Sequence, residues 1–242
     1  MSDPIYCLGD IHGQTEFLDR ALELIEKDGG ADAEIVFLGD LVDRGPDSRG
    51  VIERLISGHE KGRNWHVIKG NHDRMFSRFV RTGDQHDAQI LSGLGWMHPR
   101  LGGPATLASY GVPDCADMPL HEAYQAAAVA VPEDHLAFLE SLPTYLERDG
   151  LLFVHAGILP EVPLADQIED NLIWIRRAFH EYTAPHPWLV VHGHTALEYP
   201  EHFGNRIDLD GGAGYGRPIH PAVFEGTKCW LLTDHGRVPL TA

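Results

Sequence analysis

The sequence has few cysteines and no long apolar run. Its 242 residues include only Cys7, Cys115 and Cys229, an odd number without the paired spacing of a disulfide framework, which favours a reducing compartment. Apolar runs such as those at 151–154 and 188–191 fall far short of the roughly 20 residues that a membrane-spanning helix needs. The N-terminus has neither the basic nor the apolar segment of an export signal. We therefore expect a soluble cytoplasmic protein without a membrane partner.

Basic residues are also scarce. Lysine and arginine together number 19 against 36 aspartates and glutamates, so the formal net charge is −17. A negative field of this size repels polyanions from most of the protein surface. We therefore expect no nucleic-acid partner.

The rest of the composition is ordinary. Hydrophobic residues make up 43% of the chain and charged residues 23%, close to the averages of soluble globular proteins, which excludes disorder and fibrous repeats. A chain of this length buries one sizeable core without needing a second domain. We expect a single domain over residues 1–242.

The first third of the chain repeats a strand–loop–helix unit three times. Apolar β-rich runs are expected to form strands at 4–8, 34–38 and 66–69, and helical spacing follows each run, at 16–27, at 48–58 and after residue 72. Three such units in a row predict a mainly parallel sheet. The polar residues of each unit fall directly after its strand, where open α/β sheets bind their ligands.

The remaining two thirds of the chain change character. Residues 84–142 are mainly helical by pattern and form either a cap-like insertion or helices packed on one face of the sheet. Strand-like runs then recur at 151–154, 189–191, 206–209, 222–225 and 229–233. These runs predict a second, more antiparallel sheet. The expected fold is an α/β sandwich of two sheets flanked by helices.

Five short polar segments end predicted strands. They are Gly-Asp-Ile-His-Gly at 9–13, Gly-Asp-Leu-Val-Asp-Arg-Gly at 39–45, Gly-Asn-His-Asp at 70–73, His-Ala-Gly at 155–157 and Gly-His-Thr at 193–195. A single aspartate or histidine in a loop is usually a cap or a turn former. Five segments that all end strands indicate a shared site instead.

The side chains in these segments suit a pair of metal ions. Imidazole, carboxylate and amide oxygen together favour manganese, iron or zinc over magnesium or calcium, which prefer oxygen ligands alone. Two metals a few Å apart need a bridging carboxylate, and water bound between them becomes hydroxide near neutral pH. One of the aspartates is expected to bridge.

At this point the sequence resembles the phosphoprotein phosphatase family, whose GDxHG, GDxVDRG and GNH[ED] motifs occur here in order. The resemblance runs from residue 5 to about residue 226 and includes a DxGxxYGG-like stretch at 210–216. It implies a calcineurin-like metallophosphoesterase sandwich of two mixed sheets. It also implies two divalent metals, with Mn²⁺ first and iron or zinc as alternatives, and in-line attack by the bridging hydroxide. The implied metal ligands are Asp10, His12 and Asp40 for the first metal, and Asp40 again as the bridge with Asn71, His155 and His194 for the second.

The same resemblance implies the remaining catalytic roles. His72 protonates the leaving oxygen and Asp43 orients it, which is sound acid chemistry for an alkoxide leaving group. Phosphoryl transfer also needs guanidinium groups that grip phosphate oxygens, and Arg44 is the first candidate. Trp-Ile-Arg at 174–176 resembles the family's later W-x-R segment, which makes Arg176 the second clamp.

Two residues near these segments compete for the same roles. Arg177 is the competing assignment for the second clamp, because it directly follows Arg176. His192 lies two residues before His194 and would point to the same side of an extended strand. We interpret His192 as a structural histidine.

The substrate is less clearly marked than the reaction. Asp73 and Ala156 depart from the common GNHE and HGG pattern, and both variants are familiar in bacterial relatives and in symmetrical diadenosine tetraphosphate hydrolases. Asp43 favours a protein phosphatase, because the dinucleotide hydrolases tend not to keep an acid there. The acidic surface also favours basic phosphopeptides over nucleotides.

The first hypothesis is therefore a phosphomonoesterase that acts on phosphoserine or phosphothreonine in proteins, or on a small phosphoester. The alternative is a symmetrical diadenosine tetraphosphate hydrolase. A hypothesis of another class is a non-catalytic scaffold that binds a partner through residues 84–142.

Overall fold

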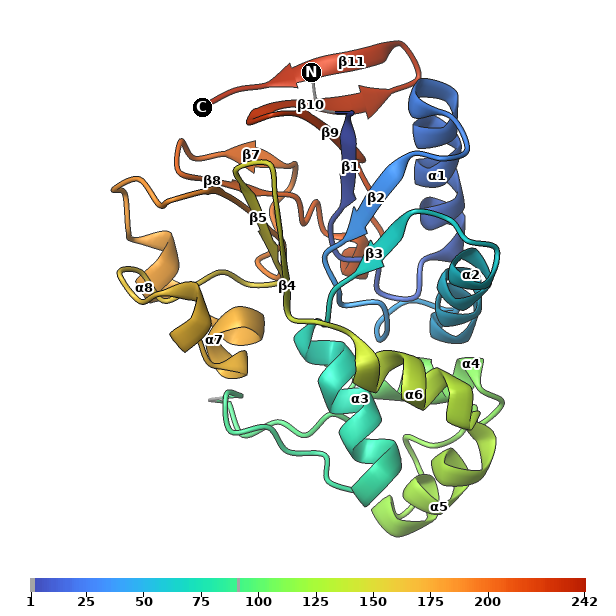
Figure 1. The fold of residues 1–242 in the computed structure, drawn as a ribbon. Helices are drawn as coiled ribbons and strands as arrows, with labels where there is room; N and C mark the ends of the chain where they lie inside the picture. Colours follow the sequence, from blue (N-terminus) through green and yellow to red (C-terminus); the bar gives the residue numbers. More distant parts are fainter. Residues whose placement is uncertain (1–2, 91) are drawn as a thin grey trace.

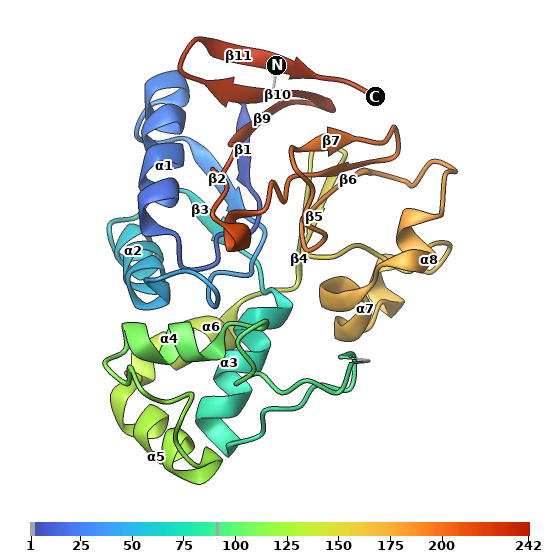
Figure 2. The ribbon, with the colours of Figure 1, turned by 180° about the vertical axis from the view of Figure 1, so that it is seen from behind.

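The computed structural model describes residues 3–90 and 92–242 and contains two facing β-sheets (Figures 1 and 2). The first sheet has the strand order β11-β10-β9-β1-β2-β3 and the second has the order β4-β5-β6-β8-β7. The strands of the first sheet are β1 (Ile5–Leu8), β2 (Glu34–Phe37), β3 (Trp65–Val67), β9 (Ala222–Glu225), β10 (Lys228–Thr233) and β11 (Gly236–Leu240). Those of the second are β4 (Tyr145–Arg148), β5 (Leu151–Val154), β6 (Leu189–His192), β7 (Glu201–His202) and β8 (Arg206–Asp208).

The first sheet confirms the predicted parallel core. β1 pairs with β2, and β2 with β3, in parallel. β9 then pairs with the other edge of β1 in antiparallel register, and β10 and β11 extend the sheet as hairpins. The expectation that residues 222–225 and 229–233 join the second sheet is therefore wrong. Short connections link β9, β10 and β11, so these strands stay in the sheet that β9 enters beside β1.

The second sheet is less antiparallel than expected. Its centre, β5-β6-β8, is parallel, and only the edge strands β4 and β7 run antiparallel to their neighbours. Parallel neighbours need long crossover connections, and the chain between β5 and β6 supplies one that contains α7 (Glu169–Trp174) and α8 (Arg177–His180). Both sheets are mixed and helices flank them, as the resemblance implied.

Successive side chains along the central strands point to opposite faces of their sheet. Tyr6 and Leu8 of β1 face the core beneath the helices, whereas Ile5 and Cys7 face the second sheet. In β5, Leu151 and Phe153 face the first sheet, and the residues between and after them face α7 and α8. Both faces of these central strands are therefore buried, which holds their carboxyl ends rigidly in place.

The helices form three groups around the sheets. Helices α1 (Thr15–Gly29) and α2 (Ser48–Glu60) cover the outer face of the first sheet, and α7 and α8 lie against the outer face of the second. The third group lies beyond the carboxyl ends of β1, β2 and β3 in both views (Figures 1 and 2). It consists of α3 (Asn71–Thr82), α4 (Gly103–Ser109), α5 (Leu120–Ala130) and α6 (Glu133–Ser141).

Residues 84–142 are less helical than expected. Helices α4, α5 and α6 account for the helical part, and residues 84–90 and 92–101 are irregular. The three helices pack mainly on α2 and α3, and the description of this region as a cap-like insertion stays a prediction. Among the residues that the structure describes, none of the helices is both long and apolar enough to span a bilayer.

Gly39 connects the fold to the site, because it links β2 to Asp40 at a point where two loops touch. Its φ is +90°, and a Cβ atom there would lie 2.4 Å from the backbone nitrogen of Gly70. Gly62 also has a positive φ, of +71°, but has open space around it. An alanine at position 62 would therefore bring backbone strain alone, whereas an alanine at position 39 would bring backbone strain and a steric collision.

We predict that Gly39→Ala unfolds at a much lower urea concentration than the wild type. A positive φ costs an alanine about 1–2 kcal/mol, and the collision adds about 1–3 kcal/mol of overpacking strain. Gly62→Ala is the matched control and should carry only the first cost. Equal urea midpoints for the two variants would contradict the close approach of the two loops.

Candidate active site

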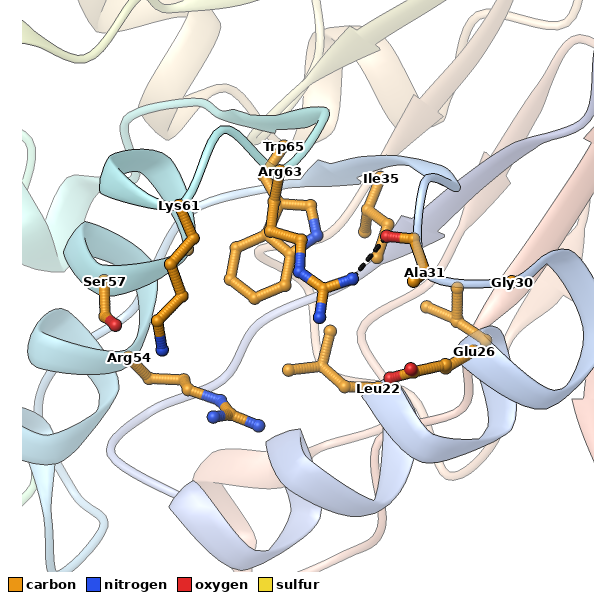
Figure 3. Close-up of a pocket in the computed structure, with 12 residues that line it drawn as sticks. Leu22, Glu26, Gly30, Ala31, Ile35, Arg54, Ser57, Lys61, Arg63 and Trp65 are labelled. Carbon is orange, nitrogen blue, oxygen red and sulfur yellow. Dashed lines mark hydrogen bonds between the residues drawn. The ribbon is translucent and has the colours of Figure 1, made fainter.

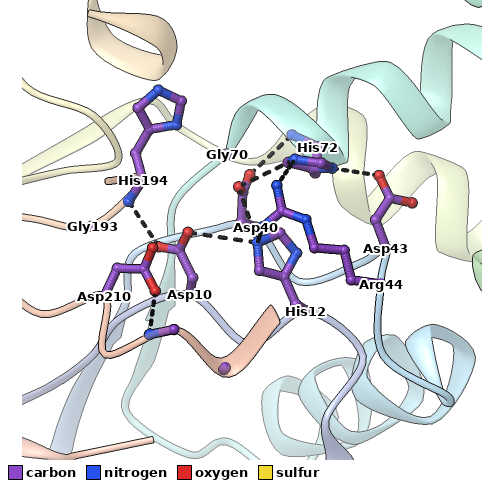
Figure 4. Close-up of polar contacts among 12 residues, drawn as sticks. Asp10, His12, Asp40, Asp43, Arg44, Gly70, His72, Gly193, His194 and Asp210 are labelled. Carbon is purple, nitrogen blue, oxygen red and sulfur yellow. Dashed lines mark hydrogen bonds and ion pairs between the residues drawn. The ribbon is translucent and has the colours of Figure 1, made fainter. Parts of the chain in front are cut away.

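The six predicted metal ligands converge where the carboxyl ends of both sheets meet, and Figure 4 shows four of them, Asp10, His12, Asp40 and His194. Each side chain is at most 7% exposed, although all six are polar. Asp10 follows β1, Asp40 follows β2, and Asn71 begins α3 after β3. His155 follows β5 and His194 follows β6. The side chains that the sequence motifs single out thus share one buried site.

Asp40 lies at the centre of the cluster. The Asp40 carboxylate lies in two clusters, one with His12 and His72 and one with His155 and His194, and the potential ligand atoms of each cluster lie within 4.8 Å of one another. His72 is the predicted acid, so of the first cluster only His12 and Asp40 belong to the predicted ligand set. Asp40 belongs to both clusters, as a bridging ligand would.

The turns that carry these residues have an uncommon backbone conformation. Seven non-glycine residues in the described part of the chain have positive φ. Five of the seven belong to the predicted site, namely His12, Asp40, Asp43, Arg44 and His194. Strained conformations of this kind persist only where the surrounding structure determines them, and they concentrate at functional sites.

Backbone carbonyls set the tautomers of two histidines. The Nδ1 atom of His12 lies 2.8 Å from the carbonyl oxygen of Val42, and that of His155 lies 2.7 Å from the carbonyl oxygen of Leu38. A carbonyl oxygen only accepts, so Nδ1 donates in both rings and Nε2 carries the lone pair in the neutral form. These Nε2 atoms lie 3.6 and 3.3 Å from the carboxylate of Asp40. Both imidazoles therefore present the atom that a metal binds.

Buried carboxylates crowd the same space. Burial, and then the neighbouring charges of Asp210 and Asp40, raise the pKa of Asp10 well above its usual range. Burial also opposes ionisation of Asp40, but the imidazoles of His155 and His72 outweigh it and hold the pKa of Asp40 well below its usual range. Several carboxylates in a space without water need positive charge nearby.

Two observations test whether metal cations fit this site. The guanidinium of Arg44 lies against the Nε2 atoms of His12 and His72, at 2.7 and 3.0 Å. A guanidinium only donates, so it stands in for a cation at the lone pairs of both rings. The Nε2 atom of His194 is buried and has no hydrogen-bond partner within the described protein. The donor set and the orphaned imidazole both fit divalent metals.

His72 and Asp43 form the predicted pair. Nδ1 of His72 lies 2.6 Å from Oδ2 of Asp43, whose side chain is fully buried. A carboxylate accepts, so Nδ1 donates and Nε2 faces the cluster (Figure 4). The geometry is that of an imidazole oriented by an acid, and the catalytic role stays a prediction.

The structure separates the two candidates for the second phosphate clamp. Arg176 reaches the site, because its guanidinium donates to the carbonyl oxygen of His194 at 3.4 Å and to the hydroxyl of Thr195 at 3.3 Å. Arg177 points into solvent and pairs with Glu181 at 2.9 Å. Arg176 therefore stays the better candidate.

His192 lies outside the ligand cluster. Its ring packs edge-on against Phe179 with a centroid distance of 5.1 Å, and burial lowers its pKa to about 3. The ring is therefore neutral at physiological pH. The Nε2 atom of His192 is buried without a hydrogen-bond partner in the described protein, so its interpretation as a structural histidine stays a prediction.

Asp73 and Asp210 lie near the ligands, although the sequence analysis gave neither of them a role in the site. Oδ2 and Oδ1 of Asp73 accept hydrogen bonds from the backbone nitrogens of Gly70 and Leu41, at 2.8 and 2.9 Å, which joins two ligand-bearing loops. Burial and the charge of Asp40 raise the pKa of Asp73 to about 6. Sequence reasoning assigned no role to Asp210, although it follows β8 in the same strand-then-aspartate pattern.

A separate hollow lies between α1 and α2, near the amino end of β2 (Figure 3). Arg54, Lys61 and Arg63 supply its positive charge, and Trp65 forms part of its apolar lining. Its only carboxylate is that of Glu26. Cationic side chains do not bind metal ions, so this hollow does not compete with the cluster around Asp40.

We predict that Asp40→Ala loses both metals and nearly all hydrolytic activity, because its carboxylate is shared by the two ligand groups. Elemental analysis after dialysis against Mn²⁺ measures the metal content. Asp32→Ala, at an exposed position, is the control and should retain two metals. Two metals bound to Asp40→Ala, with near-normal turnover, would refute the bridging role.

Comparisons with known proteins show which proteins this chain resembles. The symmetrical bis(5'-nucleosyl)-tetraphosphatase of Ralstonia nicotianae is 32% identical over 169 residues, which cover 69% of this chain and 47% of the relative. The chain therefore spans about half the length of that relative. The asymmetrical bis(5'-nucleosyl)-tetraphosphatase of Bacillus velezensis is 24% identical over an alignment that covers 95% of this chain and 97% of the relative.

A solved structure shows the same fold. It belongs to a protein provisionally named a diadenosine tetraphosphatase, and it superposes with a TM-score of 0.66 at 22% identity, over 100% of this chain and 95% of the other. The family model described as calcineurin-like phosphoesterase matches residues 3–215, which contain all six predicted ligands. The chain belongs to the calcineurin-like phosphoesterase family.

Proposed function

We propose that this protein is a metal-dependent hydrolase of bis(5'-nucleosyl) tetraphosphates. The observation that carries the proposal is the agreement between two relatives, one more similar in sequence and one similar over nearly the whole chain, whose names both specify this substrate. The sequence alone favoured phosphoproteins and kept the dinucleotide as the alternative. The relatives support that alternative better.

The chain's own residues suggest how such a substrate is handled. Asp10, His12, Asp40, Asn71, His155 and His194 would hold two divalent cations, and we propose Mn²⁺, with iron and zinc as alternatives. Such cations neutralise phosphate charge and lower the pKa of water, which supplies a nucleophile near neutral pH. Arg44 and Arg176 would grip phosphate oxygens from two sides, and Arg44 would then leave the imidazoles that it contacts here.

His72 would manage the leaving group. Its Nδ1–H is committed to Asp43 at 2.6 Å, so only Nε2 can hold the proton that the leaving oxygen receives. Phosphoryl transfer depends mainly on positioning and charge neutralisation, which buried and hydrogen-bonded side chains supply well.

An exposed aromatic residue beside the site fits a nucleobase. Tyr215 is 67% exposed, and the guanidinium groups of Arg44 and Arg217 lie 5.5 and 5.6 Å from its ring centre. Arg217 is fixed by the carbonyl oxygens of Gly211 and Leu197. A flat ring next to a phosphate-binding arginine could stack the base of a nucleotide whose phosphates lie at the metals.

A second candidate function is the hydrolysis of phosphoserine or phosphothreonine in proteins. The specific observation in its favour is the pair of His72 and Asp43, because an alkoxide leaves poorly and needs a proton donor more than a nucleotide phosphate does. The net charge of −17 also disfavours polyanionic substrates away from the arginines and metals.

We predict a kcat/KM for diadenosine tetraphosphate that exceeds that for a phosphoserine peptide by at least about tenfold, or about 1.4 kcal/mol in transition-state stabilisation. Both rates are measured side by side with Mn²⁺, and product analysis separates two ADP molecules from ATP plus AMP. The reverse preference would establish the second candidate. No hydrolysis of either substrate or of para-nitrophenyl phosphate, together with no bound metal, would leave the scaffold hypothesis.

We further predict that Tyr215→Ala raises KM for diadenosine tetraphosphate about tenfold, because base stacking contributes roughly 1–3 kcal/mol. The KM for para-nitrophenyl phosphate should stay near the wild-type value. Tyr199→Ala, at a ring that is 48% exposed and packs against His220, is the matched control. An unchanged KM for the dinucleotide in Tyr215→Ala would exclude Tyr215 as the base platform.

A further inference from the structure

The irregular chain between α3 and α4 reaches back to the turn that carries Asp43 and Arg44. The backbone nitrogen of Arg44 donates to the carbonyl oxygen of Gly102 at 3.4 Å, and that of Asp43 donates to Oγ1 of Thr106 at 2.9 Å. Gly102 has a φ of +96°, and a Cβ atom on it would lie 2.2 Å from the nitrogen of Arg44. The two segments are therefore packed backbone to backbone.

The same part of the chain supplies hydrogen-bond donors to the carboxylate of Asp43. Oδ2 accepts from Nδ1 of His72 at 2.6 Å and from Nε1 of Trp96 at 2.8 Å. Oδ1 accepts from the hydroxyl of Thr106 at 2.6 Å. Water does not reach this carboxylate, because Asp43 is fully buried. Trp96 and Thr106 are thus the donors, besides His72, that fix the orientation of its plane.

Trp96 and Thr106 are themselves held firmly. Both are fully buried. The indole of Trp96 packs on Phe76 and Phe79 of α3, with centroid distances of 5.7 and 4.8 Å. Helix α3 also carries His72 in its first turn. The donor of one hydrogen bond to Asp43 and the histidine that Asp43 orients are therefore anchored to the same helix.

The hydroxyl of Thr106 has three hydrogen-bond partners. It donates to Asp43, accepts from the Asp43 backbone nitrogen, and lies 3.0 Å from Oγ of Ser48 at the start of α2. Thr106 belongs to α4, so a single hydroxyl links α2, α4 and the turn after β2. Removing this hydroxyl leaves one carboxylate oxygen of Asp43 without a donor in a dry environment.

We propose that Trp96 and Thr106 are positioning residues, which hold the Asp43 carboxylate and through it the His72 imidazole in the orientation for proton donation. This gives the region between α3 and α5 a part in the reaction. The inference rests on the proposed function only in so far as His72 protonates a leaving oxygen. It does not depend on which phosphate substrate the protein prefers.

The kinetic test compares substrates with poor and good leaving groups. General acid catalysis contributes roughly 10²–10⁴-fold, so Thr106→Val and Trp96→Phe should lower kcat for phenyl phosphate on the order of tenfold, and kcat for 2,4-dinitrophenyl phosphate less than about twofold. Thr106→Ser keeps the hydroxyl and should restore kcat for phenyl phosphate. KM and the content of bound Mn²⁺ should stay near the wild-type values in all three variants.

Trp65→Phe is the matched control for Trp96→Phe. Trp65 is half-buried on β3, packs against Phe37 at 5.5 Å and lines the hollow between α1 and α2. Its replacement should leave the ratio of the two kcat values unchanged. Equal losses on both aryl phosphates, or a Thr106→Ser variant as impaired as Thr106→Val, would overturn the proposal.

A spectroscopic readout keeps the inference testable apart from turnover. In protein loaded with diamagnetic Zn²⁺, the proton in the short bond from His72 Nδ1 to Asp43 should give a downfield proton NMR resonance, assigned by its loss in Asp43→Asn. The resonance should move or broaden in Thr106→Val and in Trp96→Phe, and return in Thr106→Ser. An unchanged resonance in both loss variants would overturn the positioning role. A wild type that hydrolyses aryl phosphates but not diadenosine tetraphosphate would overturn only the proposed substrate.

Discussion

The structure depends on a buried carboxylate, that of Asp40, where the two sheets meet. Its oxygens accept from the His72 backbone nitrogen at 2.9 Å and lie within 3.6 Å of the imidazoles of His12 and His155. Burial of so much polar surface is tolerable only when every group has a partner or a cation. Asp73 joins the loops after β2 and β3 by two hydrogen bonds. These bonds and the strained turns hold the partners of Asp40 in place around its carboxylate.

The closeness of three candidate ligands could be predicted from the sequence because parallel strands end at a common edge, whereas the full ligand set came from the family resemblance and stays a prediction. Once three strand–loop–helix units were recognised, Asp10, Asp40 and Asn71 had to lie close together. The pairing of β9 with β1 could not be predicted in this way, since periodicity reports which face of a strand is buried but not which strand lies beside it. Hence the sheet of residues 222–233 was assigned wrongly.

Trp96 and Thr106 escaped sequence reasoning for a different reason. Their hydrogen bonds to Asp43 span 53 and 63 residues, and they lie in or next to irregular chain without strand or helix periodicity. The glycines at 102 and 103, which permit the close approach, were the one local signal. Asp210 was within reach, because it repeats the pattern of an aspartate after a strand.

The site defines a reaction more sharply than a substrate. Asp43 orients His72 in the same way whether the leaving group is an alkoxide or a nucleotide phosphate, so this acid alone does not select a phosphoprotein. The relatives and the exposed ring of Tyr215 favour a nucleotide instead.

The central claim beneath both alternatives is a pair of metals that share Asp40. X-ray anomalous diffraction from crystals grown with Mn²⁺ tests it most directly. The account predicts two peaks on opposite sides of the Asp40 carboxylate, and a single peak, or two peaks that do not contact Asp40, would contradict it.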